Sequence, residues 1–110
     1  MKLLPSLKQK KRYVVFEITS NKKFSFTEVK EAVDSAILLF FGQLGIAKSS
    51  PMLLKEKFDI EKQRFVIKVN HKYVDEIKAA LILNKNIKNT PVIIKSLTTS
   101  GTLKKASTKI

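Results

Sequence analysis

The chain has 110 residues, 44% of them hydrophobic, which is enough for one domain with a modest core. It contains no cysteine, so disulfides, thiolate metal sites and cysteine nucleophiles are excluded, and a cytoplasmic protein is expected. No apolar run approaches the length of a membrane span. The net charge of +13 favours nucleic acid as the partner over a membrane surface, because no predicted amphipathic helix has lysines opposite an exposed aromatic face.

The first predicted element is a strand at residues 12–19 (RYVVFEIT), which is rich in β-branched and aromatic residues. Val14, Phe16 and Ile18 would face one side, and Tyr13, Val15 and Glu17 the other.

A helix is predicted next, from an apolar stripe with helical spacing. The stripe consists of Val29, Ala32, Val33, Ala36, Ile37, Phe40 and Leu44. Ser25 and Glu28 are spaced for a capping box, with Thr27 as an alternative cap. Gly42 and Gly45 are expected to stop the helix.

Residues 52–59 and 64–70 predict the two strands of a hairpin, joined by the polar link IEKQ. Asn70 is a good N-cap for a second helix at 73–84, with Val74, Ile77 and Leu81 facing inward. A loop at 89–91 then leads to a last strand, PVIIKSL.

The predicted order β-α-β-β-α-β is the split βαβ, or ferredoxin-like, α+β fold. Two helices would cover one face of a four-stranded antiparallel sheet, and the last strand would lie at the edge beside the first. We therefore expect three parts: a basic N-terminal arm at 1–11, a ferredoxin-like domain at 12–98 and a basic C-terminal tail at 99–110.

The positive charge is concentrated at the two ends of the chain. Residues 1–12 contain five basic residues and no acid, and residues 77–110 contain seven lysines and no acid. The middle, residues 13–76, has ten basic and nine acidic residues. Because the first and last strands run antiparallel, we expect the arm and the tail at opposite ends of the pair, which would produce a basic stripe along that edge.

The residues needed for a protein active site are scarce. His71 is the only histidine, so no zinc site can be built, and no phosphate-loop motif occurs. We interpret His71 as a polar residue near a helix start, with a phosphate or partner contact as the alternative. No metal site is expected, and the chain alone is not expected to be catalytic.

Two modes of RNA binding are compatible with the predicted fold. In the first, aromatic rings on an open sheet face stack on unpaired bases, but here that face offers only Tyr13 among Val15, Glu17, Val66 and Lys68. In the second, lysines contact the phosphates of a folded RNA, and 20 of the 22 basic residues are lysines. We favour the second version. The alternative, a free-standing module for single-stranded RNA, predicts base preference and a strong loss on Tyr13→Ala.

The ending TTSGTLKK is a candidate phosphate site. Gly101 could adopt a positive φ and form a backbone nest for an anion, with hydroxyls from Ser100 and Thr102 and charge from Lys104 and Lys105. Thr102 could instead cap a short last helix, and an ordinary exposed turn is the simpler interpretation.

Apolar residues outside the stripe of the first helix suggest a protein partner. Leu38 falls opposite the stripe, and Leu39 and Phe41 lie on its flanks. They would either dock a partner or pack beneath the loop 45–51 or the arm. A third class of function, a regulatory domain that binds a metabolite, would need a glycine-lined pocket, for which Gly42 and Gly45 are the candidates.

Four stretches, in order, resemble the archaeal ribonuclease P protein component 2: RYVVFEI, FFGQLGIAKSSPMLLKEKFD, YVDEIKAALIL and VIIKSLTTSGTLKK. The most diagnostic motifs are F-x-G-x-L-G-x-x-K and S-G-T-[IL]-K, and the similarity runs from about Arg12 to Lys105.

The resemblance implies an accessory RNA-binding subunit of the ribonucleoprotein that removes the 5′ leader of precursor tRNA. The RNA subunit would perform the Mg²⁺-dependent hydrolysis, and this chain would bind no cofactor. Its partners would be ribonuclease P RNA, protein component 3 (in a two-plus-two assembly) and the other protein subunits. The expected RNA-binding residues are Lys10, Lys11, Arg12, Lys95, Ser100, Gly101, Thr102, Lys104 and Lys105, and the expected partner-binding residues are Leu38, Leu39 and Phe41.

Overall fold

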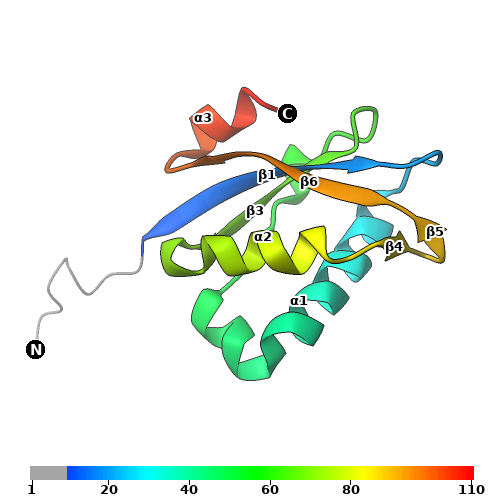
Figure 1. Cartoon of the computed structure of the whole chain (residues 1–110). Coiled ribbons are helices and arrows are strands. Elements are labelled where there is room, and N and C mark those ends of the chain that lie inside the picture. The colour runs from blue at the N-terminus through cyan, green and yellow to red at the C-terminus, as the bar shows by residue number, and fades with distance from the viewer. Residues whose placement is uncertain (1–9) are drawn as a thin grey trace, which may run out of the picture.

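The computed structural model describes residues 10–110, so most of the predicted arm lies outside the described residues. A four-stranded antiparallel sheet has the order β2-β3-β1-β6, and two long helices cover one of its faces (Figure 1). This arrangement confirms the predicted split βαβ fold. The elements are β1 (Lys11–Thr19), α1 (Phe26–Ser49), β2 (Met52–Leu53), β3 (Arg64–Asn70), α2 (Val74–Ile82), β4 (Asn86–Ile87), β5 (Thr90–Pro91), β6 (Ile93–Ser100) and α3 (Leu103–Ser107).

The main core lies between the sheet and the helices α1 and α2. The inward residues of β1 and β3 alternate as predicted, and the rings of Phe16 and Phe65 stack with centroids 5.4 Å apart. Val29, Val33 and Ile37 of α1 are buried against them, together with Ile77 and Leu81 of α2.

The start of α1 follows the predicted capping box. The amide of Glu28 donates to Oγ of Ser25 at 3.3 Å, and the amide of Ser25 donates to Oε1 of Glu28 at 3.0 Å. This backbone hydrogen bond from Ser25 lowers the pKa of the Glu28 carboxyl.

The predicted end of α1 is wrong. Gly42 breaks the helix with φ 71° and ψ 175°, but a second helical segment continues to Ser49 and ends at Ser50 in the left-handed conformation. Gly45 lies within that second segment. Leu44, beyond this break, is 70% exposed, and Phe40, just before it, is 46% exposed, although both were expected in the core.

By length and composition, α1 would also suit a membrane span. Buried helices of globular domains meet the same criteria, and here Val29, Val33 and Ile37 pack on the sheet. The break at Gly42 further shortens the straight segment. In this fold one face of α1 therefore packs on the core.

Two other elements differ from prediction. The strand expected at 52–59 is only two residues long, and a 3-10 helix, Lys55–Lys57, replaces the rest. Because β2 is an edge strand with one neighbour, pairing constrains it little, and short edge strands also discourage aggregation. The loop expected at 89–91 is part of a small hairpin, β4–β5, whose turn residues Lys88 and Asn89 both have positive φ.

The C-terminal segment is folded onto the sheet. Strand β6 continues to Ser100, and α3 lies on the face opposite α1 and α2 (Figure 1). Ala106 of α3 is fully buried against Val15 and Val66, and Arg64 Nη1 donates to the carbonyl of Lys109 at 2.9 Å. The sheet face that was expected to be open is therefore partly covered.

Candidate nucleic-acid interface

The two basic segments meet at one end of the β1–β6 pair. Tyr13 lies opposite Ser100 in the register, which places the residues before Tyr13 next to the residues after Ser100. The expectation of opposite ends is wrong, because in an antiparallel pair the beginning of one strand lies beside the end of the other. We call this cluster the basic end; it comprises Lys10, Lys11, Arg12, Lys104 and Lys105.

Arg12 and Gly101 make the closest contact between these segments. A β-carbon built on Gly101 would lie 3.4 Å from Nη1 of Arg12. Within residues 10–110, Gly42 is the glycine with a positive φ, so Gly101 does not form the predicted nest. Instead, the absence of a side chain at position 101 leaves room for the guanidinium of Arg12.

The hydroxyls of the SGT motif organise the chain locally. Ser100 Oγ accepts from the amide of Thr102 at 3.3 Å, and Thr102 Oγ1 accepts from the amide of Lys105 at 3.3 Å. Thr102 thus caps α3, as one of the two interpretations of the motif predicted. Lys104 and Lys105 are exposed on the short helix that follows.

Strand β3 adds two lysines that the sequence analysis did not place in the site. Lys68 lies opposite Tyr13 in the β1–β3 register, and Lys72 follows the end of β3. His71 holds the neighbouring strand: its amide donates to the carbonyl of Lys10 at 2.8 Å, and Nδ1 lies 3.2 Å from the same oxygen. Both contacts agree with the interpretation of His71 as a polar residue near a helix start, and neither requires a phosphate or a partner. Lys68 could have been assigned to the site only from the register of β3 against β1, which cannot be read from the sequence.

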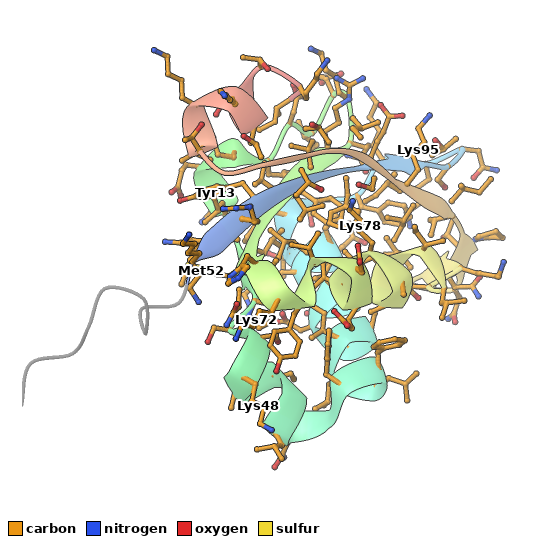
Figure 2. All side chains as sticks on the ribbon, turned by 60° about the vertical axis from the view of Figure 1, so that its left-hand side comes forward. Tyr13, Lys48, Met52, Lys72, Lys78 and Lys95 are labelled. Atoms are coloured by element: carbon orange, nitrogen blue, oxygen red, sulfur yellow. The ribbon has the colours of Figure 1, made fainter. Side chains whose placement is uncertain are left out.

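Lys95 lies apart from the basic end. Figure 2 shows Tyr13 and Met52 where β1 begins and Lys95 towards the opposite end of the sheet. Lys95 Nζ lies 3.3 Å from Oε1 of Glu17, and Arg64 Nε lies 2.8 Å from Oε2 of the same carboxylate. The Arg64 hydrogen bond is the main cause that lowers the pKa of Glu17, and Lys95 contributes to the same effect.

Four carboxylates, those of Glu17, Glu31, Asp34 and Glu61, form ion pairs with basic residues outside the basic end. In the described part of the chain the ion pairs are Lys23–Glu61, Lys30–Asp34, Arg64–Glu17, Lys88–Glu31 and Lys95–Glu17. Within that same part, Lys68, Lys104 and Lys105 have no carboxylate partner. This end of the molecule therefore presents uncompensated positive charge, which suits a polyanion.

The expected partner-binding residues on α1 have different environments. Leu39 is 89% exposed and Leu38 is 48% exposed. Phe41 packs against the core, with its ring 6.3 Å from that of Tyr73, so it does not present an exposed docking surface. Leu83, the residue that follows α2, is 64% exposed and was not expected in this role.

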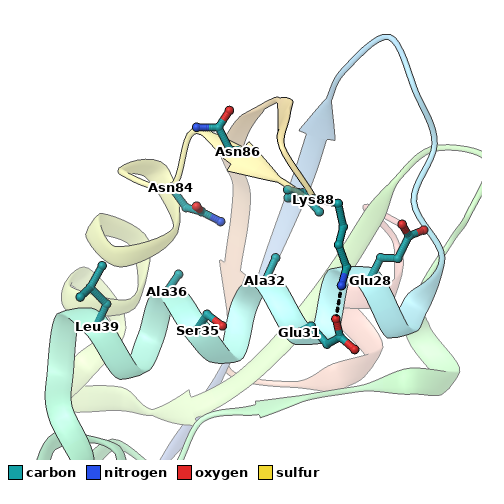
Figure 3. Close-up of a pocket in the computed structure, with 10 residues that line it drawn as sticks. Glu28, Glu31, Ala32, Ser35, Ala36, Leu39, Asn84, Asn86 and Lys88 are labelled. Carbon is teal, nitrogen blue, oxygen red and sulfur yellow. Dashed lines mark hydrogen bonds and ion pairs between the residues drawn. The ribbon is translucent and has the colours of Figure 1, made fainter.

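Leu39 lines two neighbouring grooves on α1, one between α1 and the β4 segment and one between α1 and α2. One groove, of about 310 Å³, runs towards β4 and is crossed by the Glu31–Lys88 ion pair (Figure 3). The other, of about 230 Å³, is mainly apolar and is lined by Ala36, Leu39, Phe40, Ala80, Leu83 and Asn84. Neither groove contains Gly42 or Gly45, which the metabolite-binding alternative required.

Among residues 10–110 there is no group of three histidine, aspartate or glutamate side chains close enough to hold a metal ion. The chemistry that the described residues offer is therefore cationic contact at one end and apolar contact on the helical face.

Comparison with known proteins identifies the family. The sequence pattern of the Rpp14/Pop5 family matches residues 12–110, which is nearly the whole chain. The chain belongs to the Rpp14/Pop5 family. Its resemblance to ribonuclease P protein component 2 is thereby confirmed, since curated proteins of that name are similar over most of the chain.

Two such relatives of this Rpp14/Pop5 member illustrate the similarity. Ribonuclease P protein component 2 of Pyrococcus furiosus is 38% identical over 107 residues, covering 97% of this chain and 88% of the relative. The protein of the same name from Methanocaldococcus jannaschii is 35% identical over 107 residues, covering 97% of this chain and 77% of the relative.

The Rpp14/Pop5 fold also has a counterpart among solved structures. A chain in the cryo-EM structure of yeast ribonuclease MRP superposes with a TM-score of 0.67 and covers 87% of this chain and 77% of its own length. At 16% sequence identity, this likeness supports the fold alone.

Proposed function

We propose that this chain is an RNA-binding protein subunit of ribonuclease P, the ribonucleoprotein that removes the 5′ leader of precursor tRNA. The family supports membership of such a complex, because its relatives carry the name ribonuclease P protein component 2. The observation that carries the RNA-binding part is the convergence of Lys10–Arg12 and Lys104–Lys105 at one end of the sheet.

The basic end would act by replacing counterions. A tightly folded RNA brings phosphates close together, and lysines that span two of its segments reduce their repulsion and the Mg²⁺ concentration that folding needs. In this proposal the RNA performs the Mg²⁺-dependent hydrolysis, and this chain, working in the cytoplasm, binds no metal. Arg12 and the lysines contact phosphate, while Ser100 and Thr102 shape the turn between them.

The helical face would bind another protein, for which protein component 3 is the candidate. Leu39, Phe40 and Leu83 are exposed around the apolar groove, and such a surface is suited to a protein helix. Glu28 and Glu31 line the adjoining groove, so this face is less suited to RNA than the basic end.

The free-standing module for single-stranded RNA is less well supported. It needs an open sheet face, and α3 covers Val15 and Val66 on that face. A run of stacked bases along β1 and β3 would require α3 to leave.

Reconstitution tests the proposal. Ribonuclease P RNA and the other protein subunits are combined with or without this chain, and cleavage of precursor tRNA is measured across a Mg²⁺ titration. We expect the Mg²⁺ requirement to rise when the chain is omitted and the chain alone to cleave nothing. Cleavage that is unchanged by omission, or cleavage by the protein without RNA, would contradict the proposal.

A further inference from the structure

One row of side chains crosses the whole sheet at the basic end. Met52 on β2 lies opposite Lys68 on β3, Lys68 lies opposite Tyr13 on β1, and Tyr13 lies opposite Ser100 on β6. Residues directly opposite one another project from the same face of a sheet. The four therefore form one continuous row.

Three residues of this row, Met52, Lys68 and Tyr13, lie where α3 leaves the sheet face partly accessible, whereas Ser100 at the β6 end is buried. Two residues further along β1 and β3, Val15 and Val66 lie opposite each other and are fully buried beneath Ala106. In the row itself Met52 is 57% exposed, and Tyr13 and Lys68 are only partly buried. Figure 2 shows Tyr13 and Met52 at this end of the sheet.

The row combines an aromatic ring with cations. Lys68 Nζ lies 6.0 Å from the centroid of the Tyr13 ring, within the range of a cation–π contact. Tyr13 directly follows Arg12, and Lys104 and Lys105 are exposed on the helix that borders the row. A ring on which a base can stack, next to lysines that contact phosphate, is the arrangement by which proteins bind unpaired nucleotides.

We propose that Met52, Lys68, Tyr13 and Ser100 form a subsite for one unpaired nucleobase of a folded RNA. A base that stacks on Tyr13 takes the place of Lys68 Nζ over the ring, the Met52 thioether borders the base, and Lys68 then contacts the adjoining phosphate. The buried Val15–Val66 row limits the subsite to a single base. The inference rests on the proposed RNA-binding function and adds a base contact at a position where the sequence alone favoured phosphate contacts only.

A short oligouridine with one 2-aminopurine tests the subsite on the full chain. Stacking on Tyr13 should quench 2-aminopurine fluorescence on binding, and an otherwise identical oligonucleotide with an abasic site should bind about tenfold more weakly. Tyr13→Leu should remove this difference and the quenching, whereas Tyr13→Phe, which keeps the ring, should retain both. Thermal unfolding of each variant shows whether it is folded.

The wild-type measurement needs no variant, so the proposal stays testable if Tyr13→Leu does not fold. Equal affinity for the base-containing and abasic oligonucleotides, or unquenched fluorescence at saturation, would overturn the subsite. The reconstitution experiment separates this result from failure of the proposed function. If cleavage depends on the chain but the abasic oligonucleotide binds equally well, the subsite is wrong and the phosphate-binding role stands.

Discussion

The guanidinium of Arg12 lies beside Gly101, where a β-carbon at position 101 would come within van der Waals contact of Nη1, at 3.4 Å. Through this contact the beginning of β1 meets the chain that follows β6. Residues separated by almost ninety positions in the sequence therefore form a single cationic surface.

The space at Gly101 can be tested by filling it. Gly101→Val should displace the guanidinium of Arg12, because its β-carbon would already be in van der Waals contact with Nη1 at 3.4 Å and its methyl groups extend further, and it should weaken binding to ribonuclease P RNA by about tenfold. Gly101→Ala should have a smaller effect, and neither backbone is strained because φ is not positive. A double-mutant cycle is completed by measuring the RNA affinity of Arg12→Ala and of the variant that combines Arg12→Ala with Gly101→Val. Losses that simply add would contradict the contact.

The two lysines of α3 should determine part of the salt dependence of RNA binding. Changing Lys104 and Lys105 together to Ala should reduce the slope of log affinity against log salt by about two phosphate equivalents. The matched control changes Lys88 and Lys95 to Ala, which removes the same charge from residues paired with Glu31 and Glu17. Equal changes of slope in both double variants would mean that bulk charge, not the basic end, determines affinity.

The Glu17 ion pairs should make stability depend on pH in the acidic range. Its folded-state pKa lies below the ordinary value of 4.5, mainly because of the Arg64 hydrogen bond, so the contribution is present above 4.5 and is lost as the pH falls through the lowered pKa. Glu17→Gln should lower the free energy of unfolding at pH 7 by about 1 kcal/mol, measured with urea. The difference from wild type should shrink on acidification.

Glu61→Gln is the control for this measurement. Its carboxylate pairs with Lys23 but its side chain is 80% exposed, so the change should have almost no effect on stability. A loss at pH 7 that persists unchanged at acidic pH would assign the effect of Glu17→Gln to packing instead of charge.

The apolar helical face should bind a protein partner through Leu39 and Leu83. Leu39→Asp or Leu83→Asp should weaken binding to protein component 3 roughly tenfold or more, measured by calorimetry, because each places a charge beside the apolar groove. Ile93→Asp is the control, since Ile93 is 67% exposed on β6, away from that groove. If Ile93→Asp weakens binding and the leucine variants do not, the partner occupies the other side of the molecule.

Several elements were predictable because their signals are local. The alternation in β1, the stripe from Val29 to Ile37 and the Ser25–Glu28 capping box each depend on residues within a few positions of one another. The end of α1 was not predictable in this way. Gly42 interrupts the helix with a positive φ. Whether a second helical segment follows this break depends on contacts between distant residues, such as that between Phe41 and Tyr73.

The sequence by itself determined the order of the elements, the absence of cysteine chemistry and the presence of two strongly basic ends, because composition and short-range periodicity contain this information. Only the tertiary structure decided that residues 10–12 lie beside residues 101–105, that α3 covers Val15 and Val66, and that Lys95 is paired with Glu17 instead. These are consequences of strand register and of packing between distant segments. Neither property can be read from residues that are neighbours only in the sequence.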